Sequence, residues 1–258
     1  MLVSIITVNL NDRVGLERTC ASVFEQSFTD YEHIIIDGAS VDGSLDYMET
    51  HNDKFSYWIS EPDSGVYCAM NKGIRQAKGK YLLFLNSGDV FFCNNSLQNV
   101  SKDLYSVDFI YSNINVKDNF KEYLNKPPKI LSFRYLYDNV PPHQATFIRR
   151  EVFKKFGYYD ESLKIVADWK FFLLAVCKYN ATYLYLDKTF TTFYIGGIST
   201  NPKNRNQMEA ERNQVLEKEF SILLEDIRYR FYLERIIRNL KKSKTIKVLQ
   251  YFKVLNKF

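Results

Sequence analysis

Short apolar runs alternate with amphipathic stretches along the first half of the chain. The apolar runs are VSIITVN (3–9), YEHIIID (31–37), FSYWIS (55–60) and KYLLFL (80–85), and helical patterns occupy 15–26, 44–50 and 66–77. Apolar runs rich in β-branched and aromatic residues are typical of strands that helices cover on both faces. The pattern therefore predicts an α/β fold built on an open, mostly parallel sheet.

Polar residues follow each of these predicted strands. In an open sheet of this kind, the residues after the strands meet at one edge, where ligands bind. The set at this edge is Thr7, Val8, Asn9, Asp37, Gly38, Glu61, Pro62, Asp63 and the turn Asn86, Ser87, Gly88, Asp89. The turn taken alone is explained equally by a plain connection whose Asp89 caps a following helix. Carboxylates after three of the strands favour a binding site instead.

Acidic oxygens at a sheet edge suit Mg²⁺ or Mn²⁺, which proteins bind with one or two carboxylates and substrate phosphates. They also accept hydrogen bonds from ribose hydroxyls. Neither GxxxxGK[ST] nor GxGxxG follows the first strand, so the sequence supports neither a P-loop nucleotide hydrolase nor a dinucleotide dehydrogenase. The ligand that remains compatible with these residues is a nucleoside diphosphate bound through a metal ion.

Composition and cysteine spacing narrow the class of protein. The 258 residues, 46% of them hydrophobic, can bury one large core, or one core with a small appended lobe. The four cysteines form no CxxC pair, which indicates neither a zinc site nor a disulfide framework. We also expect no signal peptide and no membrane span, because no apolar run approaches the roughly 20 residues that a span needs. The sequence predicts a cytoplasmic globular protein.

The positive charge lies at the C-terminal end. The whole chain carries +5, and residues 235–258 hold eight basic side chains and no acid, so the first 234 residues carry −3. In KSKTIKVLQYFKVLNKF (242–258) the apolar residues Ile246, Leu249, Phe252, Leu255 and Phe258 recur every three positions, with Lys247, Lys253 and Lys257 on other faces. This pattern predicts a basic amphipathic helix that binds an anionic membrane surface. The alternative is a helix that packs on the protein body or in a subunit contact; nucleic-acid binding is not expected.

Helical periodicity with few helix breakers begins near Asn204. We expect this segment to be helical and to pack on the preceding residues. The expected division is a catalytic or binding domain at 1–203 and a helical, basic extension at 204–258.

Four segments together resemble the family 2 glycosyltransferases, which are nucleotide-sugar enzymes of the GT-A fold. They are VSIITVNLN (3–11), IIIDGASVDGS (34–44), SEPDSGVYCAMNKGIRQAKGKYLLFLNSGD (60–89) and VADWKFF (166–172). Within the family, the chain looks most like bacterial colanic-acid, capsule and O-antigen transferases, over roughly its first 200 residues. The resemblance implies transfer of a sugar from a nucleoside-diphosphate sugar to a hydroxyl of a saccharide acceptor, lipid-linked, in surface polysaccharide synthesis.

The resemblance also implies roles for individual residues. The nucleotide-binding set is Thr7, Val8, Asn9, Asp37, Asp63, Asn71 and Ser87. Asp63 precedes a predicted helix, so it could equally cap that helix, and Asn71 could be a polar residue on a helix flank. LNSGD (85–89) stands where the family has its metal-binding DxD motif, with Asn86 in place of the first Asp and Asp89 as the remaining carboxylate. This departure implies that Mn²⁺ or Mg²⁺ binds together with the donor diphosphate, or that metal dependence is reduced.

The family's catalytic base is an acid at the start of a helix after the sheet, and Asp168 occupies that position in VADWKFFLLAVCKY (166–179). Its alternative role is to stabilise the first turn of that helix. His143, Gln144 and Trp169 are implied for the acceptor or donor-sugar pocket, and GGIST (196–200) looks like the flexible loop near the diphosphate.

The implied mechanism is a single displacement with inversion, in which Asp168 takes the proton of the acceptor hydroxyl. A protein of another class is the alternative: a non-catalytic nucleotide-sugar fold whose basic tail binds membrane or nucleic acid. Asn86 favours this alternative, whereas the presence of Asp37, Asp89 and Asp168 together argues against it.

Overall fold

A computed structural model describes residues 1–105, 107–118, 120–252 and 254–256. The chain divides into two compact units, Met1–Met208 and Glu209–Phe258. Lys253, Lys257 and Phe258, which belong to the predicted amphipathic helix, lie outside the described residues.

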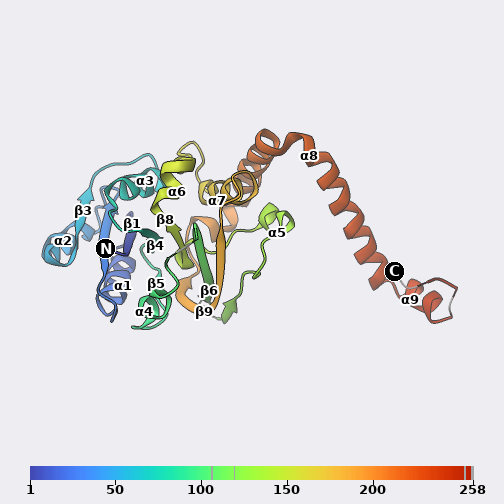
Figure 1. Cartoon of the computed structure of the whole chain (residues 1–258), viewed down its shortest axis with the longest axis horizontal. Coiled ribbons are helices and arrows are strands. Elements are labelled where there is room, and N and C mark those ends of the chain that lie inside the picture. Colours follow the sequence, from blue (N-terminus) through green and yellow to red (C-terminus); the bar gives the residue numbers. More distant parts are fainter. Residues whose placement is uncertain (106, 119, 253, 257–258) are drawn as a thin grey trace. The chain divides into compact units, whose positions relative to one another are not determined.

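The first unit is built on one mixed sheet (Figure 1). Its strands are β1 (Val3–Asn9), β2 (Tyr31–Asp37), β3 (Tyr57–Ser60), β4 (Tyr81–Phe84), β5 (Val90–Phe91), β6 (Phe109–Lys117), β7 (Glu122–Asn125), β8 (Thr146–Arg149) and β9 (Tyr183–Tyr194). They follow the order β3-β2-β1-β4-β8-β6-β9-β5, and β7 pairs with β6. Strands β1 to β4 are parallel, β6 and β9 run in the same direction, and β5, β7 and β8 run in the opposite one. The predicted α/β fold with a mostly parallel sheet is confirmed.

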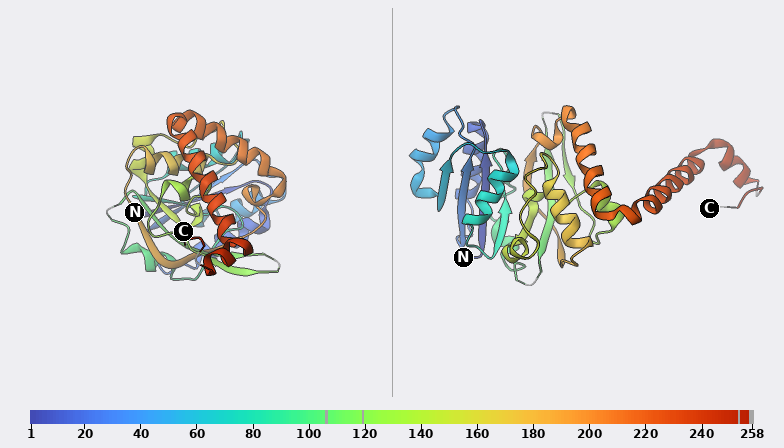
Figure 2. Two further views of the ribbon diagram at one scale, coloured as in Figure 1. Left: turned by 90° about the vertical axis from the view of Figure 1, so that its right-hand side faces the viewer. Right: turned by 90° about the horizontal axis from the view of Figure 1, so that it is seen from above.

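Helices cover both faces of this sheet (Figures 1 and 2). They are α1 (Arg13–Phe24), α2 (Ser44–Thr50), α3 (Val66–Gln76), α4 (Ser96–Ser101), α5 (Phe133–Asp138), α6 (Arg150–Phe156) and α7 (Ala167–Cys177), with short 3₁₀ turns η1 (Asn52–Lys54), η2 (His143–Ala145), η3 (Ile198–Thr200) and η4 (Pro202–Asn204). Successive side chains of a strand point to opposite faces. Ile35 accordingly packs with Leu16 of α1, and its neighbour Ile36 faces α3. A Cβ on Gly73 of α3 would lie 2.5 Å from Ile6, so glycine lets α3 approach the sheet closely.

Aromatic rings fill the core between β4, α6 and α7. Phe153 stacks on Phe171 with ring centroids 4.6 Å apart, and Tyr159 packs edge-on against Phe153 at 5.4 Å. Phe84 of β4 meets Tyr159 at 5.5 Å. Ring pairs of this kind add to the free energy of burial. They fix the segment before α7, and therefore the start of α7, relative to the end of β4.

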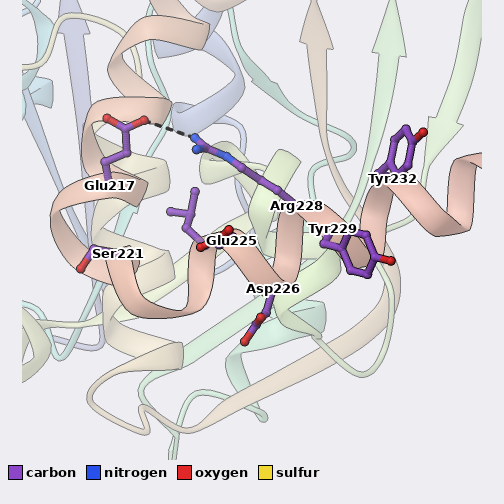
Figure 3. Close-up of a pocket in the computed structure, with 8 residues that line it drawn as sticks. Glu217, Ser221, Glu225, Asp226, Arg228, Tyr229 and Tyr232 are labelled. Carbon is purple, nitrogen blue, oxygen red and sulfur yellow. Dashed lines mark hydrogen bonds and ion pairs between the residues drawn. The ribbon is translucent and has the colours of Figure 1, made fainter.

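The second unit holds most of α8 (Arg205–Lys242) and all of α9 (Lys244–Tyr251). Helix α8 leaves helical geometry at Phe220, where φ is −136° and ψ is 26°. Across this irregularity Arg228 donates to Glu217 at 3.3 Å. The bend leaves a concavity of about 810 Å³, which Tyr229 and Tyr232 also line (Figure 3). In the described part of the chain, no helix combines the length and apolar character of a membrane span.

Candidate active site

The carboxyl ends of β1, β2 and β3 meet around one buried carboxylate. Asn9 is paired with Asp37, and Asp37 with Ser60, in the registers of these parallel strands. Asp37 is fully buried and accepts hydrogen bonds from Asn9 Nδ2 at 2.7 Å and Ser60 Oγ at 2.6 Å. The backbone N–H and the hydroxyl of Ser40 donate to the same carboxylate. Asp37 therefore joins three strand ends to the loop that follows β2.

Thr7 and Val8 connect β1 to the segment after β4. The Thr7 hydroxyl donates to the Leu85 carbonyl at 2.7 Å and lies 3.0 Å from Nε2 of His33. Burial lowers the pKa of His33 to about 3, so its imidazole is neutral. The carbonyl of Val8 accepts from the backbone N–H of Ser87 at 3.2 Å. The side chains of Thr7 and Val8 are thus part of the core beneath the edge.

Asp63 and Asn71, which the sequence placed in the same nucleotide-binding set, have different surroundings. Asp63 accepts from the Gly65 backbone N–H at 2.8 Å, and its other oxygen lies beside Gly38, directly after Asp37. Asn71 is buried on α3 and bonds both the N–H and the carbonyl of Tyr159, at 3.1 and 2.9 Å. Asp63 therefore stands at the strand-end edge, whereas the Asn71 amide holds the segment that precedes α7.

The turn after β4 is tied to α1 and presents several oxygen atoms. Gly88 has φ of 97°, a left-handed conformation that favours glycine. Thr19 of α1 donates to the carbonyl of Asp89 at 2.7 Å and accepts from the Gly88 N–H at 3.0 Å. Within the described residues, Oδ1 of Asn86 and Oγ of Ser87 are buried without a hydrogen-bond partner. These are the atoms that a bound ligand would satisfy.

Asp89 is a buried carboxyl with a shifted pKa. Burial raises the pKa of Asp89 to about 7, although the charges of His143 and Arg18 oppose this shift. Among the described residues, no cluster of three His, Cys, Asp or Glu side chains could hold a metal ion. Asp89 together with the unpartnered oxygens of Asn86 and Ser87 is nevertheless a donor set of the kind that Mg²⁺ or Mn²⁺ takes when phosphates supply the other ligands.

His143 lies between this turn and the start of α7. Its Nε2 is 3.3 Å from Asn86 Nδ2, and its Nδ1 is 3.6 Å from Oδ2 of Asp168. Burial lowers the pKa of His143, but the hydrogen bond and charge of Asp168, with the charge of Asp89, outweigh this effect and raise it. The sequence-predicted residues Asn86, Asp89, His143 and Asp168 are thus brought together.

Asp168 lies in the first turn of α7 with both oxygens in contact. The Tyr67 hydroxyl donates to Oδ1 at 2.8 Å and is also 2.7 Å from the carbonyl of Ile165. Burial raises the pKa of Asp168, but the hydrogen bond and charge of His143 and the bond from Tyr67 outweigh it, so the pKa lies below its usual value. The arrangement keeps an ionised carboxylate in a largely desolvated place.

Gln144 and Trp169 are both buried. Gln144 follows His143 in η2, and the indole N–H of Trp169 donates to the Leu136 carbonyl of α5 at 2.7 Å. The Trp169 side chain thus connects α7 to α5, whereas the neighbouring Asp168 side chain faces His143.

Three contacts of the site are not evident from the sequence: Ser40 and Ser60 on Asp37, and Tyr67 on Asp168. Ser60 ends a predicted strand, so its place at the edge follows from the pattern, although its partner does not. Tyr67 and Asn71 are four residues apart in one helix and share a face, which the spacing indicates. Their partners lie about a hundred residues later in the chain, and no local pattern links the two segments.

Comparison with known proteins identifies the family of the chain. The model of glycosyl transferase family 2 matches residues 4–157. An uncharacterized glycosyltransferase of Mycobacterium tuberculosis is 36% identical over 190 residues, which cover 68% of this chain and 70% of that protein. A PGL/p-HBAD biosynthesis glycosyltransferase of Mycobacterium bovis is 30% identical over 179 residues, 65% of this chain and 67% of that one. The chain belongs to glycosyl transferase family 2 and is a glycosyltransferase.

Solved structures share the fold. Staphylococcus aureus TarS 1-349 in complex with UDP-GlcNAc has a TM-score of 0.63 at 20% identity, over 84% of this chain and 71% of that one. The mannosyltransferase PcManGT from Pyrobaculum calidifontis, in complex with GDP-Man and Mn²⁺, has a TM-score of 0.59 at 14% identity, over 98% and 84%. At these identities the likeness shows the fold alone, which is that of the GT-A glycosyltransferases.

Proposed function

We propose that this glycosyltransferase moves a sugar from a nucleoside-diphosphate sugar to a hydroxyl of a saccharide acceptor, in the synthesis of a surface polysaccharide or glycolipid. The observation that carries the proposal is the placement of Asp89 and Asp168 around His143 at the strand-end edge. The names of the relatives support the product class: one acts in PGL/p-HBAD biosynthesis, and TarS is seen with a nucleotide sugar.

The nucleoside part of the donor binds at the ends of β1, β2 and β3. Asp63, whose second oxygen lies beside Gly38, and Asn9, whose Oδ1 has no hydrogen-bond partner among the described residues, supply acceptor atoms for the ribose and base. Because the Asp37 network is closed within the protein, Asp37 acts chiefly by holding the loop 38–44 in place. Thr7 and Val8 support this edge from the core, and Asn71 supports it through the Tyr159 segment.

The diphosphate binds at the turn Asn86–Asp89. Asp89, assisted by Asn86 Oδ1 and Ser87 Oγ, would hold Mg²⁺ or Mn²⁺ together with phosphate oxygens of the donor. When bound, the cation supplies positive charge for the departing nucleoside diphosphate. Asp89 must ionise to take this role, so cation binding displaces a proton from it near neutral pH.

Asp168 is the general base of a single displacement with inversion. Its carboxylate accepts the proton of the acceptor hydroxyl, whose oxygen forms a bond to the anomeric carbon as the bond to the diphosphate oxygen breaks. The leaving nucleoside diphosphate keeps the bonding electron pair. His143 and Tyr67 hold the Asp168 carboxylate in position and ionised before the reaction. Gln144, in the turn with His143, helps to shape the acceptor and donor-sugar pocket, and Trp169 fixes its wall through α5.

The enzyme acts at the cytoplasmic face of a membrane, where a lipid-linked acceptor would be presented. Lys241, Lys242, Lys244 and Lys247 are exposed in the second unit, and so are Val248, Tyr251 and Phe252. These basic and apolar side chains extend from the end of α8 to the residue after α9, and their combination favours an anionic interface.

A panel of nucleoside-diphosphate sugars tests the proposal. Purified protein with Mn²⁺ should release the nucleoside diphosphate from at least one donor, slowly to water and faster with a saccharide acceptor. The competing function is that of a non-catalytic module that binds membrane through its basic tail, which Asn86 at the turn favours. Binding of a nucleoside diphosphate without release from any donor, with membrane binding intact, would support that module and refute the enzyme.

A further inference from the structure

A cationic side chain lies beside the turn Asn86–Asp89, where the diphosphate is proposed to bind, and it has no role in the mechanism above. Arg18 is an exposed residue of α1, and its Nη2 lies 3.5 Å from the place that a Cβ on Gly88 would occupy. The next residue, Thr19, bonds both Gly88 and Asp89. The two hydrogen bonds of Thr19 therefore fix α1, and with it Arg18, against the turn.

The guanidinium of Arg18 is supported by an aromatic ring. Its central carbon lies 4.1 Å from the ring centroid of Tyr194, the last residue of β9. A guanidinium over a ring keeps its N–H donors in its own plane and free for another partner, and the planar fork matches the oxygens of a phosphate. The ring thus restricts the side chain without using its donors.

No carboxylate of the described residues forms an ion pair with Arg18. On the same helix, Glu17 pairs with Arg13 at 2.9 Å, and Asp12 accepts from the Gly15 N–H at the helix start. The charge of Arg18 does act on the carboxyl of Asp89. A guanidinium that an aromatic ring holds beside Gly88, and that forms no ion pair among the described residues, can bind an anion at this turn.

We propose that Arg18, held over Tyr194, binds a phosphate of the donor diphosphate and stabilises the charge of the leaving nucleoside diphosphate. This inference rests on the proposed function. Asn86 and Asp89 together carry one negative charge where two carboxylates would carry two, so the turn attracts a cation less strongly. A guanidinium at the same turn supplies part of the positive charge that the leaving group needs.

Comparing the affinity for a nucleoside diphosphate with that for the nucleoside alone separates a phosphate-binding role of Arg18 from a structural one. Calorimetry with saturating Mn²⁺ would compare UDP, GDP, dTDP, CDP and ADP with the matching nucleosides, for the wild type and three variants. Arg18→Gln should weaken the preferred diphosphate about ten- to hundredfold and leave the nucleoside unchanged, because charge-assisted bonds to phosphate are lost. Arg18→Lys should fall between, since it keeps the charge without the fork.

Arg149→Gln is the matched control. Arg149 is a half-buried arginine at the far end of β8, where it is paired with Glu151. The Arg149→Gln variant should bind the diphosphate as the wild type does. If Arg18→Gln binds the diphosphate as tightly as the wild type, or loses nucleoside and diphosphate equally, the phosphate role is wrong. If the wild type binds no nucleoside diphosphate at all, the proposed function fails, and the role of Arg18 fails with it.

Discussion

Nδ1 of His143 lies 3.6 Å from Oδ2 of Asp168, and the two groups shift each other's pKa in opposite directions. Burial raises the pKa of the Asp168 carboxyl, and the hydrogen bond and charge of the imidazole are the largest influences that lower it. We therefore expect His143 to act as a positioning residue that keeps the Asp168 carboxylate ionised.

Replacing His143 should move the acidic limb of the pH profile. In His143→Gln, burial raises the pKa of Asp168 without opposition from the imidazole, so the base is protonated at higher pH. Because a hydrogen bond to a charged group contributes about 1.5–3 kcal/mol, the acidic limb should rise by roughly one to two pH units. The limb is read from kcat with saturating donor and Mn²⁺, so that Asp89 is already ionised and Asp168 is the group that titrates. Tyr67→Phe should shift it in the same direction by less.

His51→Gln serves as the control for that profile. His51 lies at the end of α2, bonded to the Tyr47 carbonyl, and its replacement should leave the limb in place. An unchanged acidic limb in His143→Gln would mean that Asp168 does not depend on His143 for its ionisation.

Asn71 should contribute to stability. Asn71→Ala leaves the buried N–H and carbonyl of Tyr159 without their partners, at about 1–3 kcal/mol for each unsatisfied group. We expect a loss of about 2–4 kcal/mol in the free energy of unfolding, measured by urea denaturation. Asn139→Ala removes one exposed bond to Tyr135 and should cost less than about 1 kcal/mol. Equal stability of Asn71→Ala and the wild type would contradict the structural role of Asn71.

The basic tail should bring the protein to anionic vesicles. Each lysine near an anionic surface adds about 1 kcal/mol, and salt screens this attraction. The intact protein should float with anionic but not neutral liposomes at low salt. Removal of residues 241–258, or Lys→Gln at 241, 242, 244 and 247, should abolish flotation while donor hydrolysis persists. Lys→Gln at the exposed positions 54, 102, 121 and 203 should change nothing.

Failure of the intact protein to float with anionic vesicles at low salt would refute the membrane role. The tail would then belong to the core or to a subunit contact.

Local patterns in the sequence predicted the first half of the sheet well. The predicted strand that ends at Asp37 and the predicted helix at 44–50 coincide with β2 and α2. Asp37 and the glycine after it mark the end of the strand, and Gly43 marks the start of the helix. Helix α1 begins at Arg13, two residues before the predicted start, since the Asp12 side chain caps it. The parallel registers follow from the same runs and bring Asn9 onto Asp37.

Contacts across long stretches of chain were beyond such patterns. Tyr67 and Asp168 meet only because the aromatic core fixes α7 beside α3, and Arg18 reaches Gly88 through the packing of α1 on the turn. Neither contact produces a periodic pattern in the sequence from which it could be predicted. The division into 1–203 and 204–258 and the roles of the individual site residues stay predictions.

The most direct test of the account is to separate binding from turnover at its two carboxylates. Asp89→Asn should weaken Mn²⁺-dependent binding of the preferred nucleoside diphosphate in calorimetry. Asp168→Asn should bind it nearly as the wild type does, yet lose roughly 10²–10⁴-fold in kcat, the contribution of a general base. An equal loss of binding in both variants, or full turnover by Asp168→Asn, would contradict the assignment of Asp168 as the base.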